Sequence, residues 1–122
     1  MNTYPSDNGE ILLSSLIGAN LNTGNDQSIG LPDGLKRLTR IVAVGADGTT
    51  ATVEGGIYTG AGQTGTIVVA AAQAWAALTA TKSLELTIDN DYLVGTGLFL
   101  TLSVLEGSAC LCDIYVFGEM LG

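Results

Sequence analysis

The strongest constraint on the fold is a two-residue alternation of apolar and polar side chains near the end of the chain. In residues 98–104 every second position from Leu98 is aliphatic, and residues 110–116 repeat the pattern from Cys110. Alternation with this period is typical of β-strands that bury one face. The polar segment 106–108 contains glycine and favours a turn. The sequence therefore predicts two strands joined as a β-hairpin.

Shorter β-rich runs separated by glycines precede this pair. Residues 41–44 are apolar on both faces, which indicates a strand buried on both sides. Residues 47–48 are Asp-Gly, which predicts a hairpin turn into a returning strand at residues 49–53. Two further strands are expected at residues 57–59 and 66–69, on either side of a glycine-rich loop.

Three other segments complete the expected architecture. Residues 10–21 indicate a short strand or an irregular segment, residues 83–88 alternate like a strand, and the alanine-rich residues 70–80 favour a helix. Seven or eight short strands with at most one short helix predict an all-β fold, a β-sandwich or jelly roll. We expect residues 1–9 to form an extended arm and residues 10–122 to form a single domain.

Composition narrows the chemistry. The chain has 122 residues, of which 47% are hydrophobic and 13% charged, and it contains no histidine. Without histidine, a His-based catalytic triad and an imidazole metal ligand are excluded. We therefore predict no catalytic residue, no cofactor site and no metal site, and we expect the protein not to be an enzyme. A domain so poor in charge is expected to cover part of its surface in an oligomer.

Two local motifs match patterns of ligand-binding loops, but the residues around them do not fit those loops. Residues 60–65 match the G-x-G-x-x-G pattern of dinucleotide-binding loops, but β-forming residues 66–69 follow where a helix is required. We interpret this segment as a flexible hairpin loop. Residues 89–91 could begin a calcium loop, but Leu93 and Val94 occupy positions that need an oxygen ligand and a glycine. We interpret them as a polar turn.

The two cysteines, Cys110 and Cys112, are two positions apart on a predicted strand. Both side chains then point to the same face, which is a poor geometry for a mutual disulfide. We expect two buried thiols that pack as small apolar side chains.

The formal net charge of −8 argues against nucleic acid as the main partner. Three of the four basic residues, Lys36, Arg37 and Arg40, lie within five positions. They either form a solvated strand edge or loop flank, or contact an acidic partner. The longest nearly apolar stretch, residues 67–78, is shorter than the ~20 residues of a membrane-spanning helix, so no membrane contact is expected.

The aromatic residues are few. Tyr115 and Phe117 lie two apart on a predicted strand, where they either pack on the sheet or form part of a subunit interface. Tyr4 lies in the predicted arm, which could become ordered on a neighbouring protein. The candidate residues for contact with another protein or with another subunit are Tyr4, Lys36, Arg37, Arg40, Tyr115 and Phe117.

Three segments give the chain a family resemblance. They are residues 19–34, residues 55–59 with 67–70 and 75–79, and residues 98–102 with 107–118. The sequence resembles the small capsid decoration (cement) proteins of tailed bacteriophages, which are encoded beside the major capsid protein. The resemblance implies a jelly roll or similar sandwich that forms a homotrimer on the outer surface of the virion. The trimer would bind the major capsid protein and stabilise the shell, after assembly in the host cytoplasm.

Two alternatives remain open. One is a phage head-fibre component or another receptor- or carbohydrate-binding sandwich, which requires Tyr58, Trp75 and Tyr92 to face solvent on one rim. The other is a small β enzyme, which requires several carboxyl groups to converge in a pocket.

Overall fold

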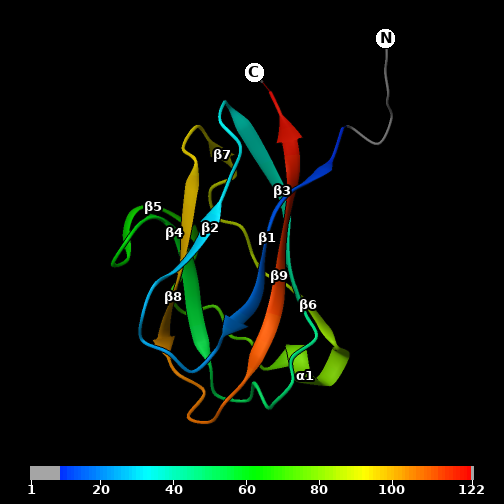
Figure 1. The fold of residues 1–122 in the computed structure, drawn as a ribbon, viewed down its shortest axis with the longest axis vertical. Coiled ribbons are helices and arrows are strands. Elements are labelled where there is room, and N and C mark those ends of the chain that lie inside the picture. The colour runs from blue at the N-terminus through cyan, green and yellow to red at the C-terminus, as the bar shows by residue number, and fades with distance from the viewer. Residues whose placement is uncertain (1–8, 122) are drawn as a thin grey trace.

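Two antiparallel β-sheets pack face to face in the computed structural model, which describes residues 9–121 (Figure 1). The five-stranded sheet comprises β1 (Ile11–Asn20), β9 (Leu111–Met120), β3 (Lys36–Val44), β6 (Ser83–Glu85) and β7 (Tyr92–Leu93). The four-stranded sheet comprises β2 (Gln27–Gly30), β8 (Gly97–Val104), β4 (Glu54–Gly60) and β5 (Thr64–Val69). Residues 1–8 of the predicted arm, Tyr4 among them, lie outside the described residues.

The strand order is that of a jelly roll. The sheets have the orders β1-β9-β3-β6 and β2-β8-β4-β5, and β7 pairs with the same strand, β3, as β6 does. Taking β6 and β7 as one interrupted strand gives eight strands, four in each sheet, wound as in double-sheet jelly rolls. The predicted all-β sandwich is therefore confirmed. Within residues 9–121, no helix combines the length and hydropathy needed to cross a bilayer.

The core lies between the sheets and is filled from both sides. β8 contributes Leu98, Leu100 and Leu102, whereas β9 contributes Ile114 and Val116, all buried. The predicted one-faced rows are thus confirmed from Leu98 to Leu102 and from Cys110 to Val116, whereas Val104 at the end of β8 is exposed. Cys110 and Cys112 are also buried and free, as expected.

The predicted hairpin between these two strands is wrong. β8 pairs with β2 and β4, whereas β9 pairs with β1 and β3, so the turn at residues 106–108 carries the chain from one sheet to the other. An apolar row shows that a strand has a buried face, but it does not show which sheet holds the strand. Here the two rows face each other across the core.

The predicted hairpin at residues 47–48 is also wrong, for the same reason. β3 and β4 belong to different sheets, and residues 49–53 form a loop between them rather than a strand. The buried carboxylate of Glu106 holds this loop, because its Oε1 accepts hydrogen bonds from the backbone N–H of Thr52 (2.9 Å) and Val53 (3.0 Å).

The helix is shorter than the expected residues 70–80. α1 covers only Ala77–Thr81, because Trp75 is fixed before it can enter a helix. The Trp75 backbone N–H donates to the carbonyl of Val53, and the indole N–H donates to the carbonyl of Gly55 (3.2 Å). The Trp75 side chain is fully buried there.

Three remaining expectations have mixed outcomes. The glycine-rich residues 60–65 do form the β4–β5 hairpin, whose tip is residues 61–63. The ambiguous residues 10–21 contain a full strand of ten residues, β1, with two register shifts. The strand expected at residues 83–88 ends at Glu85, because the following residues cross toward β5.

Candidate functional site

Four of the predicted interface residues share one surface, the outer face of the five-stranded sheet. Along β9, half-buried residues alternate with buried ones, so Tyr115 and Phe117 point away from the core. Strand register places Arg40 beside Phe117 and Arg37 beside Glu119. We call the surface formed by the outward side chains of β1, β9 and β3 the outer face.

The centre of the outer face is a cross-strand row. Phe117 on β9 lies between Leu12 on β1 and Arg40 on β3. The Arg40 guanidinium carbon lies 4.3 Å from the centroid of the Phe117 ring, which is a cation–π distance. Leu12 is 51% exposed, so the row presents an exposed aliphatic side chain beside a half-buried aromatic ring and a half-buried arginine. The next row contains Tyr115, with Ser15 and Val42 beside it.

Arg40 is paired within the chain. Its Nη2 lies 3.2 Å from Oε1 of Glu10, and the hydroxyl of Thr39 donates to the other oxygen of the same carboxylate. The hydrogen bond from Arg40, followed by that from Thr39, lowers the pKa of Glu10. The same bond raises the pKa of Arg40. The two charges therefore neutralise each other at this end of the outer face.

Arg37 forms the second ion pair. Its Nη2 and Nε both lie 3.0 Å from Oε1 of Glu119, and this hydrogen bond is the main reason that the pKa of Arg37 is raised. Both predicted arginines are thus already bound to carboxylates of their own chain. This pairing weakens the expectation that they contact an acidic partner.

Lys36 does not lie on the outer face. Its side chain is 0% exposed, and its Nζ donates a 2.7 Å hydrogen bond to the carbonyl of Gly95. Burial lowers the pKa of this amine. Neither reading of Lys36 is correct, because in this fold a buried side chain is neither solvated nor available to a partner.

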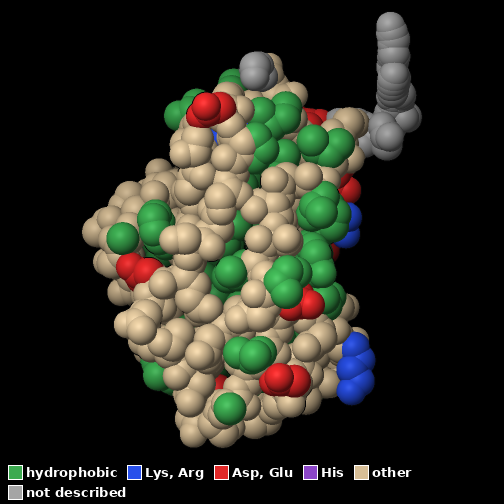
Figure 2. Space-filling view, viewed as in Figure 1, with side chains coloured by type: hydrophobic (Ala, Val, Ile, Leu, Met, Phe, Trp, Pro, Cys, Tyr) green, Lys and Arg blue, Asp and Glu red, His purple; other side chains and the backbone are tan. Residues whose placement is uncertain are grey.

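Strand β1 adds exposed apolar residues that the sequence reasoning missed. Ile11, Leu12 and Ile17 are all exposed, and β1 forms the edge of the sheet. Figure 2 shows hydrophobic side chains over β1 and β9, with charged side chains scattered around them. The available signal was that residues 11–20 are uncharged but have apolar residues at both odd and even positions.

The aromatic rim required by the carbohydrate-binding alternative does not form. Tyr92 is 62% exposed, but Tyr58 is 3% exposed and Trp75 is fully buried. Tyr92 lies beside a hollow of about 540 Å³ that Phe99 and Thr59 also line. One exposed ring is less than this alternative requires.

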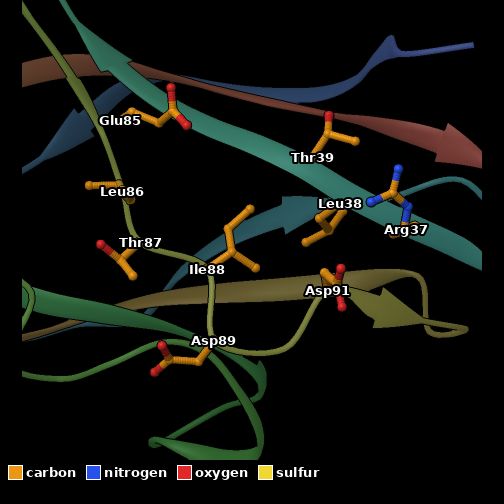
Figure 3. Close-up of a pocket in the computed structure, with 9 residues that line it drawn as sticks. All are labelled: Arg37, Leu38, Thr39, Glu85, Leu86, Thr87, Ile88, Asp89 and Asp91. Carbon is orange, nitrogen blue, oxygen red and sulfur yellow. The ribbon is translucent and has the colours of Figure 1, made fainter. Parts of the chain in front are cut away.

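A larger groove of about 620 Å³ lies beside β3, where residues 86–91 leave the five-stranded sheet (Figure 3). Leu38 and Ile88 lie between the two backbones, and Glu85, Asp89 and Asp91 lie around them. Figure 3 shows these three carboxyl groups well apart, which is unlike the convergent pair of an acid–base site. Among residues 9–121, no group of three or more His, Cys, Asp or Glu side chains is placed to hold a metal ion.

Comparison of the chain with protein-family models, with curated proteins and with solved structures gives no match. The function must therefore be argued from the residues and their arrangement.

Proposed function

We propose that this chain is a structural protein of a virion, a capsid decoration protein. In this proposal it forms a homotrimer that binds the outer surface of the major capsid protein and stabilises the shell. The observation that carries the proposal is the outer face of the jelly roll, where exposed apolar side chains of β1 lie beside the half-buried rings of Tyr115 and Phe117. Large exposed apolar patches mark surfaces that bind other proteins.

The resemblance in three segments supports the same conclusion. In the structure these segments run through both sheets and meet in one core, since they contain parts of β1, β2, β4, β5, β8 and β9. The resemblance therefore concerns the scaffold and its packing.

Physical reasoning also favours this function. A shell that holds packaged DNA gains stability from many added contacts on its outside. Each subunit can bind weakly, because three linked subunits bind together far more tightly than one. The net charge of −8 suits a protein on the outer surface, away from the nucleic acid.

A sedimentation experiment tests the proposal. Shells of the major capsid protein from the same virus are purified free of decoration proteins. They are then mixed with increasing amounts of this chain and pelleted. We expect saturable binding, with bound copies in multiples of three, and a higher temperature of shell disruption. Absence of the chain from the pellet at all concentrations would overturn the proposal.

Of the aromatic rim that a receptor- or carbohydrate-binding module requires, the exposed ring of Tyr92 beside its hollow is the one member that faces solvent. A glycan array tests this alternative directly. Binding that is lost in Tyr92→Ala would favour this alternative, whereas a blank array combined with shell binding would dismiss it.

A further inference from the structure

We propose that the outer face is the surface through which copies of this chain contact one another. The partner is a second copy of the same chain. This inference rests on the proposed function and deepens it, because a trimer needs such a surface and the resemblance does not say where it lies.

The edge strand β1 gives the first argument. β1 is ten residues long and contains neither a charged residue nor a proline, two of the means of keeping an edge strand from pairing with another chain, although it has two register shifts. Within the described chain, β9 is the only strand that pairs with it. The side-chain amide of Gln27 covers the C-terminal end of β1. Its oxygen accepts a hydrogen bond from the Asn20 N–H (2.7 Å), and its nitrogen donates one to the Asn20 carbonyl (2.8 Å). Among residues 9–121, no side-chain hydrogen bond of this kind covers the part of β1 that bears Ile11 and Leu12.

Charge gives the second argument and identifies the occupant. Copies of a chain with a net charge of −8 repel one another over most of their surface. On the outer face, however, the ion pairs of Arg37 and Arg40 neutralise two carboxylates, which leaves Asp113 as the outward carboxylate of β1, β9 and β3 outside an ion pair. Two copies can therefore approach here at the least electrostatic cost.

The same distribution of charge disfavours a basic partner on the outer face. Such a partner would be drawn instead to carboxylates outside the two ion pairs, such as Glu85, Asp89 and Asp91 around the groove beside β3. A face with apolar side chains, aromatic rings and one carboxylate outside an ion pair resembles the core of a subunit interface, where charged residues are depleted.

The mass of two matched variants in solution tests the inference. Leu12→Glu places a charge on the outer face, whereas Ile67→Glu places one on β5 of the other sheet; the native side chains are 51% and 46% exposed. By size exclusion with light scattering, we expect the wild type and Ile67→Glu to have three times the 12.4 kDa mass of the chain. The Leu12→Glu trimer should dissociate into single chains at protein concentrations at least about tenfold higher than those at which the wild-type trimer dissociates, because burying an unpaired charge is costly.

A second variant checks the electrostatic argument. Arg40→Gln leaves Glu10 without its ion-pair partner, so each copy gains a net negative charge on the outer face. We expect weaker self-association at low salt that recovers as salt screens the repulsion. A dissociation constant independent of salt would contradict the argument.

The outcomes separate this inference from the proposed function. If Leu12→Glu keeps the wild-type mass, the inference fails, and shell binding by the wild type would still support the proposed function. If Leu12→Glu keeps that mass but loses shell binding, the outer face contacts the shell and the inference is overturned. If Leu12→Glu dissociates but wild-type trimers do not bind shells, the inference holds and the proposed function fails.

Discussion

At the residue scale, one buried carboxylate fixes a loop that the sequence pattern predicts as a strand. Glu106 accepts two backbone hydrogen bonds from the 49–53 loop, and the Val53 amide is itself buried. We expect Glu106→Ala to lower the free energy of unfolding by about 2–4 kcal/mol, because the amides lose their acceptor. Glu106→Gln keeps an acceptor oxygen and should lose much less. Urea unfolding followed by circular dichroism measures both, and equal losses would contradict this role of the carboxylate.

A second residue-scale prediction concerns alkaline pH. Burial raises the pKa of the Cys112 thiol from its ordinary value of 9.0 to about 12. The unfolded chain therefore releases this proton at lower pH than the folded chain does. The stabilising effect is complete below pH 9.0 and is lost as the pH rises from 9.0 toward 12.

The variant Cys112→Val removes this thiol and keeps a similar apolar volume. Between pH 9 and pH 12 its stability should fall less steeply than that of the wild type, by up to about 1.4 kcal/mol per pH unit. Other titrating groups are common to both proteins, so the difference isolates Cys112. Parallel curves of unfolding free energy against pH would show that the thiol does not contribute.

At the scale of elements, Asp26 ties the β4–β5 hairpin to the rest of the four-stranded sheet. Its carboxylate accepts from the Thr101 hydroxyl (2.6 Å) and from the Gly62 N–H at the hairpin tip (2.8 Å). We expect Asp26→Ala to speed hydrogen exchange at Gly62, whereas Asp33→Ala, at an exposed position, leaves it unchanged. Equal exchange in both variants would contradict this role.

The same carboxylate predicts an acid effect. The hydrogen bond from Thr101, and then that from Gly62, lowers the pKa of Asp26 below its ordinary value of 3.8. The stabilisation is therefore present above pH 3.8 and is lost as the pH falls through the lower folded value. Exchange at Gly62 should accelerate in this acidic range in the wild type, after correction for intrinsic rates, and not in Asp26→Ala.

The element scale also shows how far the sequence is predictive. Two-residue alternation identifies β8, β9 and their buried faces, because period alone decides which side chains point inward. It does not assign strands to sheets, since that depends on contacts far apart in the chain. The hairpins predicted at residues 47–48 and 106–108 fail for this reason, whereas the one predicted at residues 60–65 forms within one sheet.

The residues of the candidate site also divide into those that the sequence pattern predicts and those that it does not. Tyr115 and Phe117 could be predicted to share a face, because they are two positions apart on a regular strand. Arg37 and Arg40 are three positions apart, and a register shift between Leu38 and Arg40 brings both to that face. Leu12 could not be predicted, because a register shift between Leu12 and Ser14 breaks the alternation in β1. Lys36 fails as well, since a lysine is rarely expected to be buried beside a backbone carbonyl.

At the scale of the whole molecule, the distribution of charge matters more than its total. Lys36 is buried and both arginines are paired, which leaves Lys82 as the remaining basic side chain of the chain. Carboxylates therefore outnumber basic side chains over the rest of the surface. This arrangement permits contacts between copies at one place and disfavours them elsewhere.

Electron cryomicroscopy of shells saturated with the chain tests the central claim most directly. The account predicts added density on the outside of the shell, resolved as trimers with three jelly rolls that contact one another through β1 and the outer face. Shells without added density, or with isolated single copies bound through another surface, would contradict it.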